Sequence, residues 1–276
     1  MQRKYHFIAG LPRSGSTLLS SILNQNPRFS ASITDALISY ARSVIVNTDA
    51  DSGIRSLVPV EKQKRMIHGL FDSYYYDGNE VCFNTNRAWS AHTNLIEDLY
   101  PQAKIILCIR EVNWILDSFE KLHQKHPYDL KAVYGNADLP TVYHRTNSLI
   151  DLHAGGSGLV GHSVLNTKQA LYSNQQKNIC VIEYDTLCEQ PRAVMQRLYE
   201  FLDEPWFEHD FDDVTANYDE YDRALNMKDL HKVRKSVSLI KRTPIIPEDL
   251  WQRWEKETFW RNDFDHIKKK MLWLGS

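Results

Sequence analysis

The feature that most constrains the fold of this chain is a short glycine loop between an apolar segment and an amphipathic one. The apolar segment Tyr5–Ala9 is typical of a buried strand, and apolar side chains recur with helical spacing between Thr17 and Leu23. The loop between them, Gly10 to Thr17, has two glycines separated by four residues and followed by two hydroxyl side chains. A loop placed between a strand and a helix N-terminus surrounds an anion with backbone N–H groups. The sequence therefore predicts an α/β fold that binds a phosphate or sulfate group.

Three further apolar segments have the length and composition of strands buried on both faces: Val81–Asn84, Lys104–Ile109 and Ile179–Glu183. Helical spacing follows at Ile115–Leu122 and at Val194–Leu202, where Pro191 lies near the first turn. Strands that alternate with helices indicate a central parallel sheet flanked by helices. Ligands of such sheets bind outside the carboxyl ends of the strands. We therefore predict an α/β fold of the P-loop nucleotide-binding type.

The length and composition are compatible with one large α/β domain. The chain has 276 residues, of which 42% are hydrophobic and 25% charged, as is ordinary for a globular protein. Residues 124–160 are rich in turn-forming residues and predict a lid or an insertion. The tail contains Trp251, Trp254, Trp260 and Trp273, and such large aromatic side chains favour packing back onto the body. We predict a single domain over residues 1–276.

Charge and cysteine use limit the partners and the compartment. The formal net charge is −2, so the chain has no overall positive field for nucleic acid, and any anion must be held locally. The four cysteines form no CxxC pair, and three lie in apolar, strand-like runs, which predicts buried thiols in a reducing compartment. No apolar run approaches the ~20 residues of a membrane span, and the apolar stretch near the N-terminus is too short for a signal peptide. We expect a cytoplasmic protein without a membrane span.

One position separates this loop from that of nucleoside triphosphatases. The Walker A spacing is present, but Ser16 occupies the place of the lysine that contacts the β- and γ-phosphates of a triphosphate. The sequence shows no obvious acidic partner for magnesium, and we predict no metal site. Arg13, inside the loop, offers a planar guanidinium suited to a sulfate or phosphate. The simpler alternative is a turn rich in Gly, Pro and Ser that only opens an amphipathic helix.

The segment Gly-Leu-Pro-Arg-Ser-Gly-Ser-Thr-Leu-Leu resembles the 5′-phosphosulfate loop of sulfotransferases that use 3′-phosphoadenosine 5′-phosphosulfate (PAPS). The tyrosylprotein and carbohydrate branches of that family are the most similar. The resemblance implies PAPS as the donor and adenosine 3′,5′-bisphosphate (PAP) as the product. It also implies that five loop residues bind the phosphosulfate end of PAPS: Arg13, Ser14, Gly15, Ser16 and Thr17.

The same family has an arginine after a strand and, eight positions later, a serine that together hold the 3′-phosphate. This sequence has Arg110 directly after the segment Lys104–Ile109, and Ser118 lies about two turns into the following helix. An arginine after a strand is by itself often a surface charge. In combination with the glycine loop, the resemblance implies that Arg110 and Ser118 bind the 3′-phosphate.

Two weaker matches concern the remainder of the nucleotide. Tyr184, in Ile-Glu-Tyr-Asp-Thr-Leu, stands where the family places an aromatic residue beside the adenine; a packed core tyrosine is the alternative. Lys232, in Leu-His-Lys-Val-Arg, belongs to a stretch similar to the segment that closes over the nucleotide in tyrosylprotein sulfotransferases. The resemblance implies that Lys232 contacts a phosphate, and a solvated basic surface is the alternative.

Sulfuryl transfer is an in-line displacement that requires positioned partners, cations near the bridging oxygen and a base for the acceptor proton. We predict Arg13 and Arg87 as the cations. The related tyrosylprotein enzymes carry a lysine near this place, where the chain has Thr85, and a structural ion pair is the alternative for Arg87. In those enzymes the catalytic glutamate aligns with Thr34, and Asp35 stands next to it. We predict Asp35 as the general base, with a helix N-cap as the alternative.

The acceptor is predicted to carry a hydroxyl group, with peptide tyrosine first and sugars or small alcohols as alternatives. Several histidines are reserve bases, although no motif singles one out: His92, His144, His153, His162 and His231. Two other functions compete with sulfuryl transfer, namely a P-loop kinase-like phosphotransferase and a non-catalytic nucleotide-binding module. The sequence carries no signal for the oligomeric state.

Overall fold

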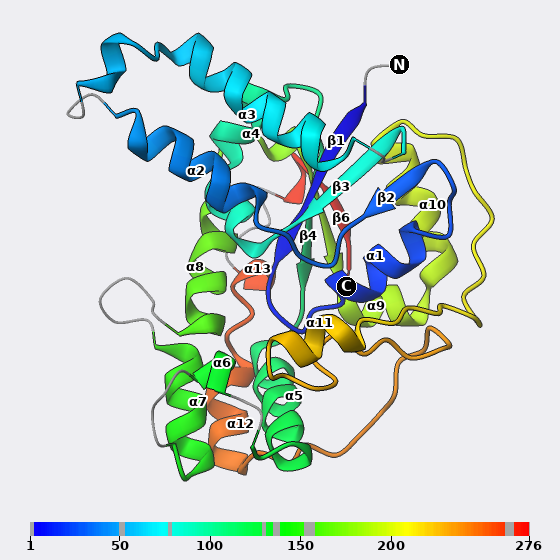
Figure 1. Cartoon of the computed structure of the whole chain (residues 1–276). Helices are drawn as coiled ribbons and strands as arrows, with labels where there is room; N and C mark the ends of the chain where they lie inside the picture. Colours follow the sequence, from blue (N-terminus) through cyan, green and yellow to red (C-terminus); the bar gives the residue numbers. More distant parts are fainter. Residues whose placement is uncertain are drawn as a thin grey trace.

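A computed structural model describes residues 3–49, 53–76, 79–128, 131–134, 139–151, 158–262 and 268–275. Within these residues, six parallel strands form one sheet in the order β2-β3-β1-β4-β5-β6 (Figure 1). The strands are β1 Lys4–Gly10, β2 Phe29–Ala31, β3 Val81–Thr85, β4 Ile105–Ile109, β5 Ile179–Glu183 and β6 Leu272–Leu274. The four strands expected from the sequence are confirmed, as is the α/β class with helices on both faces of a parallel sheet.

The helices alternate with the strands along the chain. They are α1 Ser16–Leu23, α2 Leu37–Asn47, α3 Val60–Tyr74, α4 Thr93–Leu99, α5 Val112–Lys125, α6 Lys131–Tyr134, α7 Val142–Ile150, α8 Leu159–Leu171, α9 Tyr184–Glu189, α10 Pro191–Leu202, α11 Asp219–Ala224, α12 Glu248–Glu255 and α13 Phe259–Asn262. Short 3₁₀ turns lie at η2 Ile54–Ser56, η3 Arg87–Ala91 and η5 Gln176–Asn178. The three helices expected from apolar spacing correspond to α1, α5 and α10.

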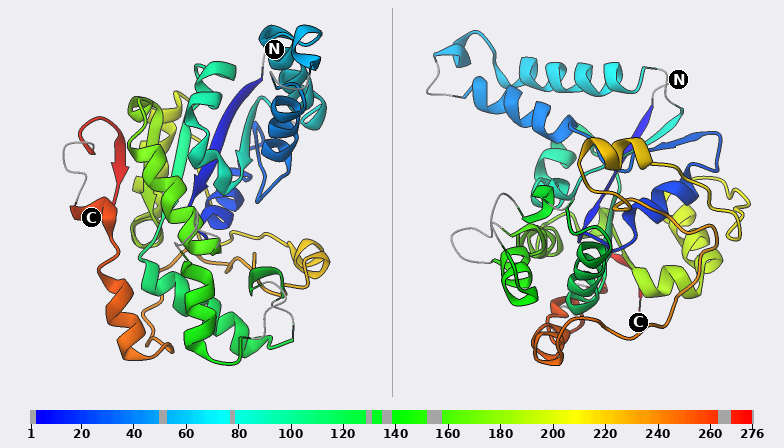
Figure 2. Two further views of the ribbon diagram at one scale, coloured as in Figure 1. Left: turned by 90° about the vertical axis from the view of Figure 1, so that its left-hand side faces the viewer. Right: turned by 60° about the horizontal axis from the view of Figure 1, so that its bottom comes forward.

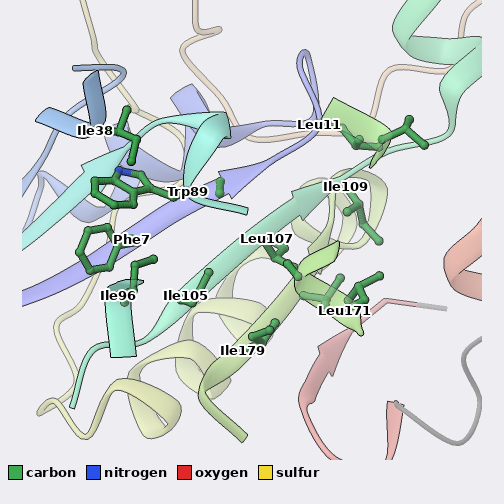
Figure 3. Packing of buried hydrophobic residues seen from close by; sticks show 14 of the residues in the cluster. Phe7, Leu11, Ile38, Trp89, Ile96, Ile105, Leu107, Ile109, Leu171 and Ile179 are labelled. Carbon is green, nitrogen blue, oxygen red and sulfur yellow. The ribbon is translucent and has the colours of Figure 1, made fainter. Parts of the chain in front are cut away.

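Two hydrophobic layers enclose the sheet because successive strand side chains point to opposite faces. Phe7 and Leu107 point into one layer, which receives side chains from α2, α3, α4, α5, α7, α8 and α12 (Figure 3). Ile8 and Ile106 point into the other layer, which receives side chains from α1, α9 and α10. Both layers leave the carboxyl ends of β1, β3 and β4 open toward the loops that follow them.

The C-terminal tail belongs to the body of the molecule, as the tryptophans predicted. Trp260 is buried, and Trp251, Trp254 and Trp273 pack against the first hydrophobic layer. β6 pairs with β5 as the outermost strand of the sheet. All four cysteines are buried and free, including the three expected to be buried from the apolar runs that contain them.

The region 124–160, expected to be a lid or insertion, is described in part. It contains the end of α5, then α6 and α7, which lie beyond the carboxyl edge of the sheet (Figure 2). Tyr143 of α7 donates a hydrogen bond to Asp249 of α12 at 3.0 Å. A buried ion pair ties α7 to α5, with Arg145 donating to both carboxylate oxygens of Glu120 at 2.8 and 2.9 Å. Residues 129–130, 135–138 and 152–157 of the region lie outside the described residues. Its role as a lid stays a prediction.

No helix in the described part of the chain has both the length and the apolar character needed to span a bilayer.

Candidate active site

The loop between β1 and α1 makes a tight turn that glycine and one strained arginine allow. The backbone at Gly10, Arg13 and Gly15 has φ values of +108°, +56° and +91°, all in the left-handed region. A Cβ atom at Gly10 would lie 2.1 Å from the carbonyl oxygen of Cys108 on the neighbouring strand, so only glycine fits there. Ser14 fixes the turn from inside, because its hydroxyl donates to the carbonyl oxygens of Leu11 and Cys108. The Ser14 side chain is therefore occupied, and its backbone N–H is the group that remains for a ligand.

The N-terminus of α1 opens toward this turn without a side-chain cap. Gly15 is the residue before the helix, and no side chain accepts a hydrogen bond from the first N–H groups. Unpaired N–H groups at a helix start, together with the helix dipole, favour an anion. The hydroxyl groups of Ser16 and Thr17 stand in the same turn. The loop thus has the electrostatics expected of a phosphate- or sulfate-binding turn.

A cavity of about 380 Å³ lies at the carboxyl edge of the sheet, in front of this loop. Its wall combines the loop with the residues that follow β3 and β4, one face of α5, the start of α9 and the segment after α11. Nine of the predicted site residues line it: Arg13, Gly15, Ser16, Thr17, Arg87, Arg110, Ser118, Tyr184 and Lys232. Residues separated by more than two hundred positions in the sequence therefore share one cavity of the size that takes a small ligand.

Arg13 joins the two halves of the predicted anion site. Its Nε donates to the hydroxyl of Ser118 at 3.1 Å, and its guanidinium also donates to the carbonyl oxygen of Leu230. Burial, and next the nearby charge of Arg110, lower the pKa of Arg13 to about 10. Arg13 therefore keeps its positive charge at neutral pH while it lies close to a second arginine. Two buried cations this close favour a bound anion between them.

Arg110 is stacked rather than ion-paired. Its guanidinium carbon lies 4.1 Å from the ring centre of Tyr184 and 5.9 Å from that of Trp114. Its Nε is buried and has no hydrogen-bond partner within the described part of the chain. Burial lowers the pKa of Arg110 from its ordinary value. A buried donor without a partner is costly, so an anionic ligand at this place would satisfy it.

Arg87 begins η3 directly after β3. Asn86 caps this turn by accepting from the N–H of Ala88 at 3.0 Å, which fixes the place where the chain leaves the sheet. No carboxylate in the described ranges forms an ion pair with Arg87. The structural ion pair considered as the alternative is thus absent from those ranges, and Arg87 faces the cavity from the β3 side.

A covering segment, residues 225–246, closes the cavity from the side opposite to the sheet. Asp229 ties it to the end of α5 through Lys125 and through His126 at 2.8 Å. Further along, the buried Asp117 of α5 binds Arg242 and accepts from the backbone N–H of Ile245 at 2.6 Å. These contacts hold the segment over the loop, and Figure 1 shows it running from α11 past α5 to α12.

Lys232 lies on the cavity side of the covering segment, and its ammonium is 3.7 Å from a carboxylate oxygen of Asp229. The side chain is largely exposed, as a solvated basic surface would also have it. Its contact with a phosphate stays a prediction.

Residues 6–208 match the profile described as the sulfotransferase family. The chain belongs to the sulfotransferase family. A putative protein-tyrosine sulfotransferase of Caenorhabditis briggsae is 23% identical over 202 residues, which are 71% of this chain and 64% of that relative. The chain thus spans less than two thirds of the length of this curated relative.

One solved structure shows the same fold. The sulfotransferase domain from the curacin biosynthetic pathway superposes with a TM-score of 0.54 at 14% identity, over 98% of this chain and 96% of that domain. A sulfotransferase from Alicyclobacillus acidocaldarius gives a TM-score of 0.44 at 14% identity, over 81% of this chain and 89% of the other.

Asp35, the predicted base of this sulfotransferase, lies just before α2. One carboxylate oxygen accepts from the N–H of Leu37 at 3.0 Å and the other from the hydroxyl of Ser32 at 3.0 Å. The neighbouring Thr34 lines the cavity, whereas Asp35 is not part of its wall. Burial raises the pKa of Asp35 to about 6, against the effect of these hydrogen bonds. The bond to Leu37 resembles the capping alternative, and the role of Asp35 as a base stays a prediction.

Sequence reasoning missed several side chains that contact Arg110 or Tyr184. Trp114 stacks on Arg110 and also on Arg242, whose guanidinium carbon lies 4.9 Å from its ring centre. Arg234 of the covering segment donates to the hydroxyl of Tyr184 at 3.2 Å. Arg110 precedes α5 and Trp114 lies in its first turn, so their closeness in the sequence was a signal for the first of these contacts. The second depends on long-range packing and left no local signal.

Proposed function

We propose that this sulfotransferase transfers a sulfuryl group from PAPS to a hydroxyl group of an acceptor. The observation that carries the proposal is that one cavity brings together the glycine loop with its open helix N-terminus and the cations Arg13 and Arg110. PAPS carries a phosphosulfate on the 5′ carbon of its ribose and a phosphate on the 3′ carbon. We assign the phosphosulfate to the glycine loop and the 3′-phosphate to Arg110.

The phosphosulfate end of PAPS fits the loop. Backbone N–H groups from Ser14 to Thr17 and the hydroxyls of Ser16 and Thr17 are its proposed ligands. The 3′-phosphate is proposed to bind Arg110 and Ser118, where the unpaired Nε of Arg110 would gain an acceptor. Tyr184, stacked on Arg110, is proposed to lie beside the adenine.

Catalysis is proposed to depend mainly on charge and position. Arg13 and Arg87 face the cavity from two sides and would offset the negative charge that grows on the bridging oxygen as the sulfur–oxygen bond breaks. Because Ser118 and Leu230 already hold Arg13 before the reaction starts, Arg13 needs little reorganisation during it. Asp35 is retained as a proposed base.

The acceptor class is proposed from the relatives and from the chemistry of the reaction. The Caenorhabditis relative is described as a protein-tyrosine sulfotransferase, so peptide tyrosine is the first acceptor to try. Sugars and small alcohols present the same hydroxyl chemistry and belong in the same assay.

Thermal unfolding tests the donor. We expect PAP to stabilise the protein without magnesium, by about 2.7 kcal/mol at a hundred times its dissociation constant. ADP with magnesium should stabilise it less, because Ser16 stands where a triphosphate-binding loop has lysine. A preference for ADP with magnesium over PAP would favour a kinase-like function. Stabilisation by PAP without transfer to any hydroxyl acceptor would favour a non-catalytic module.

A further inference from the structure

Asp222 of α11 and His231 of the covering segment form a buried pair beyond the part of the chain that matches the family profile. The Asp222 carboxylate is 2% exposed. One of its oxygens accepts from the backbone N–H of His231 at 2.9 Å, and the other lies 2.6 Å from Nδ1 of the same residue. One carboxylate thus holds both the backbone and the ring of His231, which fixes the orientation of the imidazole.

The free nitrogen of this imidazole is available to the cavity. An ionised carboxylate only accepts hydrogen bonds, so Nδ1 carries the proton and Nε2 of the neutral ring is left with its lone pair. Nε2 makes no hydrogen bond to another residue in the described ranges. His231 lines the cavity, and its side chain is 14% exposed. The arrangement is that of a histidine oriented by a carboxylate so that its other nitrogen can take a proton.

The charges around His231 favour the neutral ring. Burial lowers the pKa of the His231 imidazole. The Asp222 carboxylate raises this pKa, whereas the charges of Arg13 and Arg87 lower it, and the net effect is a decrease. The ring of Tyr221 packs edge-on at 5.4 Å between centres. Arg13 and Arg87 are also the two cations proposed to face the transferring group. The imidazole shares the cavity wall with both of them, so in the proposed reaction it would face the transferring group.

We infer that His231 is the general base of the proposed sulfuryl transfer and that Asp222 is its positioning residue. The inference rests on the proposed function. In this step Nε2 of His231 takes the proton of the acceptor hydroxyl while the acceptor oxygen forms a bond to sulfur. The bond between sulfur and the bridging oxygen of the 5′-phosphate breaks, and its electron pair stays on that oxygen of PAP. Atoms and charge balance without a further reactant.

His231 differs from Asp35 in both access and orientation. Both oxygens of Asp35 accept hydrogen bonds at the start of α2, and Asp35 is not part of the cavity wall. His231 is part of that wall and directs its occupied nitrogen away, toward Asp222. The two residues are therefore alternatives that one experiment can separate.

The experiment compares His231→Gln and Asp35→Asn with the wild type, using radiolabelled PAPS and two acceptors, phenol and p-nitrophenol. The assay runs above the pKa of p-nitrophenol, so that this acceptor is ionised and needs no base, whereas phenol does. We expect His231→Gln to lower kcat with phenol by about 10²- to 10⁴-fold and to have a much smaller effect with p-nitrophenol. The dissociation constant of PAP should not change. His68→Gln, on α3 and outside the wall of the cavity, is the matched control and should keep full activity.

Asp222→Asn provides a readout that a purely structural role would not give. Without the carboxylate the pKa of His231 falls, so we expect the acid limb of the pH–kcat profile with phenol to move to lower pH. The maximal kcat should fall as well, because the ring loses its orientation. An unshifted acid limb would contradict the positioning role.

Two results would overturn the assignment of His231. One is an equal loss with both phenols, which indicates damage to the donor site. The other is full activity of His231→Gln with loss in Asp35→Asn. A wild type that binds PAP but transfers sulfate to neither phenol would contradict the proposed function instead. In that case nitrogen NMR can still determine which ring nitrogen of His231 carries the proton. A proton on Nε2 and none on Nδ1 would overturn the assignment of His231 as the base.

Discussion

At the scale of single residues, Arg110 offers the sharpest test of the donor site. Its guanidinium is stacked between aromatic rings and has a buried Nε without a partner in the described part of the chain. We expect Arg110→Ala to weaken PAP binding by about 1.5–3 kcal/mol, or roughly 10- to 150-fold, because charge-assisted bonds to the 3′-phosphate are lost. Adenosine 5′-phosphosulfate, which lacks the 3′-phosphate, should lose much less affinity. Isothermal titration with both ligands measures the difference.

The control for this variant is Arg197→Ala. Arg197 lies on the exposed face of α10, where it pairs with Glu200, so its loss should leave both affinities unchanged. An equal loss of affinity for PAP and for adenosine 5′-phosphosulfate in Arg110→Ala would contradict the assignment of the 3′-phosphate to Arg110.

Some residues of the cavity can be recognised from their own stretch of sequence, and others only from their contacts in the folded chain. Arg13, Arg110 and Ser118 stand at fixed distances from strand ends, so the sequence alone placed them at the carboxyl edge. The pairing of Asp222 with His231 joins α11 to the covering segment, and nothing in the apolar spacing of either segment indicated that they meet. A histidine becomes recognisable as a base only when its hydrogen-bond partner is known, and that partner is supplied by tertiary packing.

At the scale of elements, the loop between β1 and α1 is the critical piece. Gly15 has a φ of +91°, and a Cβ atom added to it would lie 2.8 Å from the Tyr184 ring. We expect Gly15→Ala to cost about 1–3 kcal/mol of stability through backbone strain and to weaken PAP binding by about tenfold or more, because the loop and Tyr184 must move apart. Denaturant unfolding and PAP titration measure the two effects.

Gly53 is the matched control for this change. It also has a positive φ, +67°, but a Cβ atom there would meet nothing within 4 Å. Gly53→Ala should therefore show only the strain cost, with PAP affinity as in the wild type. Unchanged affinity in Gly15→Ala would mean that the contact between the loop and Tyr184 does not shape the donor site.

Among the elements that sequence reasoning missed, the two short strands depend on their neighbours. β2 and β6 have three residues each, and both lie at an edge of the sheet, where they pair with β3 and β5. Three residues carry too little alternation to separate a strand from a loop, so their structure is set by the strand beside them. The other four strands needed no such help, because apolar runs such as Ile-Ile-Leu-Cys-Ile in β4 and Ile-Cys-Val-Ile in β5 already indicate strands covered on both faces.

At the scale of the whole molecule, the prediction of one domain can be tested through the C-terminal tail. Trp260 is 1% exposed within the first hydrophobic layer, which also contains Phe7 of β1 and Phe119 of α5. Arg261, next to it, forms ion pairs with Glu111 at 2.8 Å and with Glu183 at 3.1 Å. If the tail and the part of the chain that contains the glycine loop share one core, a cavity opened in the tail must destabilise both parts.

We therefore expect Trp260→Ala to lower the free energy of unfolding by about 3–5 kcal/mol, as truncation of a buried tryptophan does. Circular dichroism and tryptophan fluorescence should still report one coincident transition, moved to lower denaturant concentration, because a single core unfolds as one unit. Trp206→Ala is the control, since Trp206 is 37% exposed and its loss should cost far less. Two separate transitions, with PAP still protecting the more stable one, would show instead that the tail folds apart from the donor site. The cover that β5 and α5 receive from the tail would then not be needed to hold Arg110 and Ser118 in place.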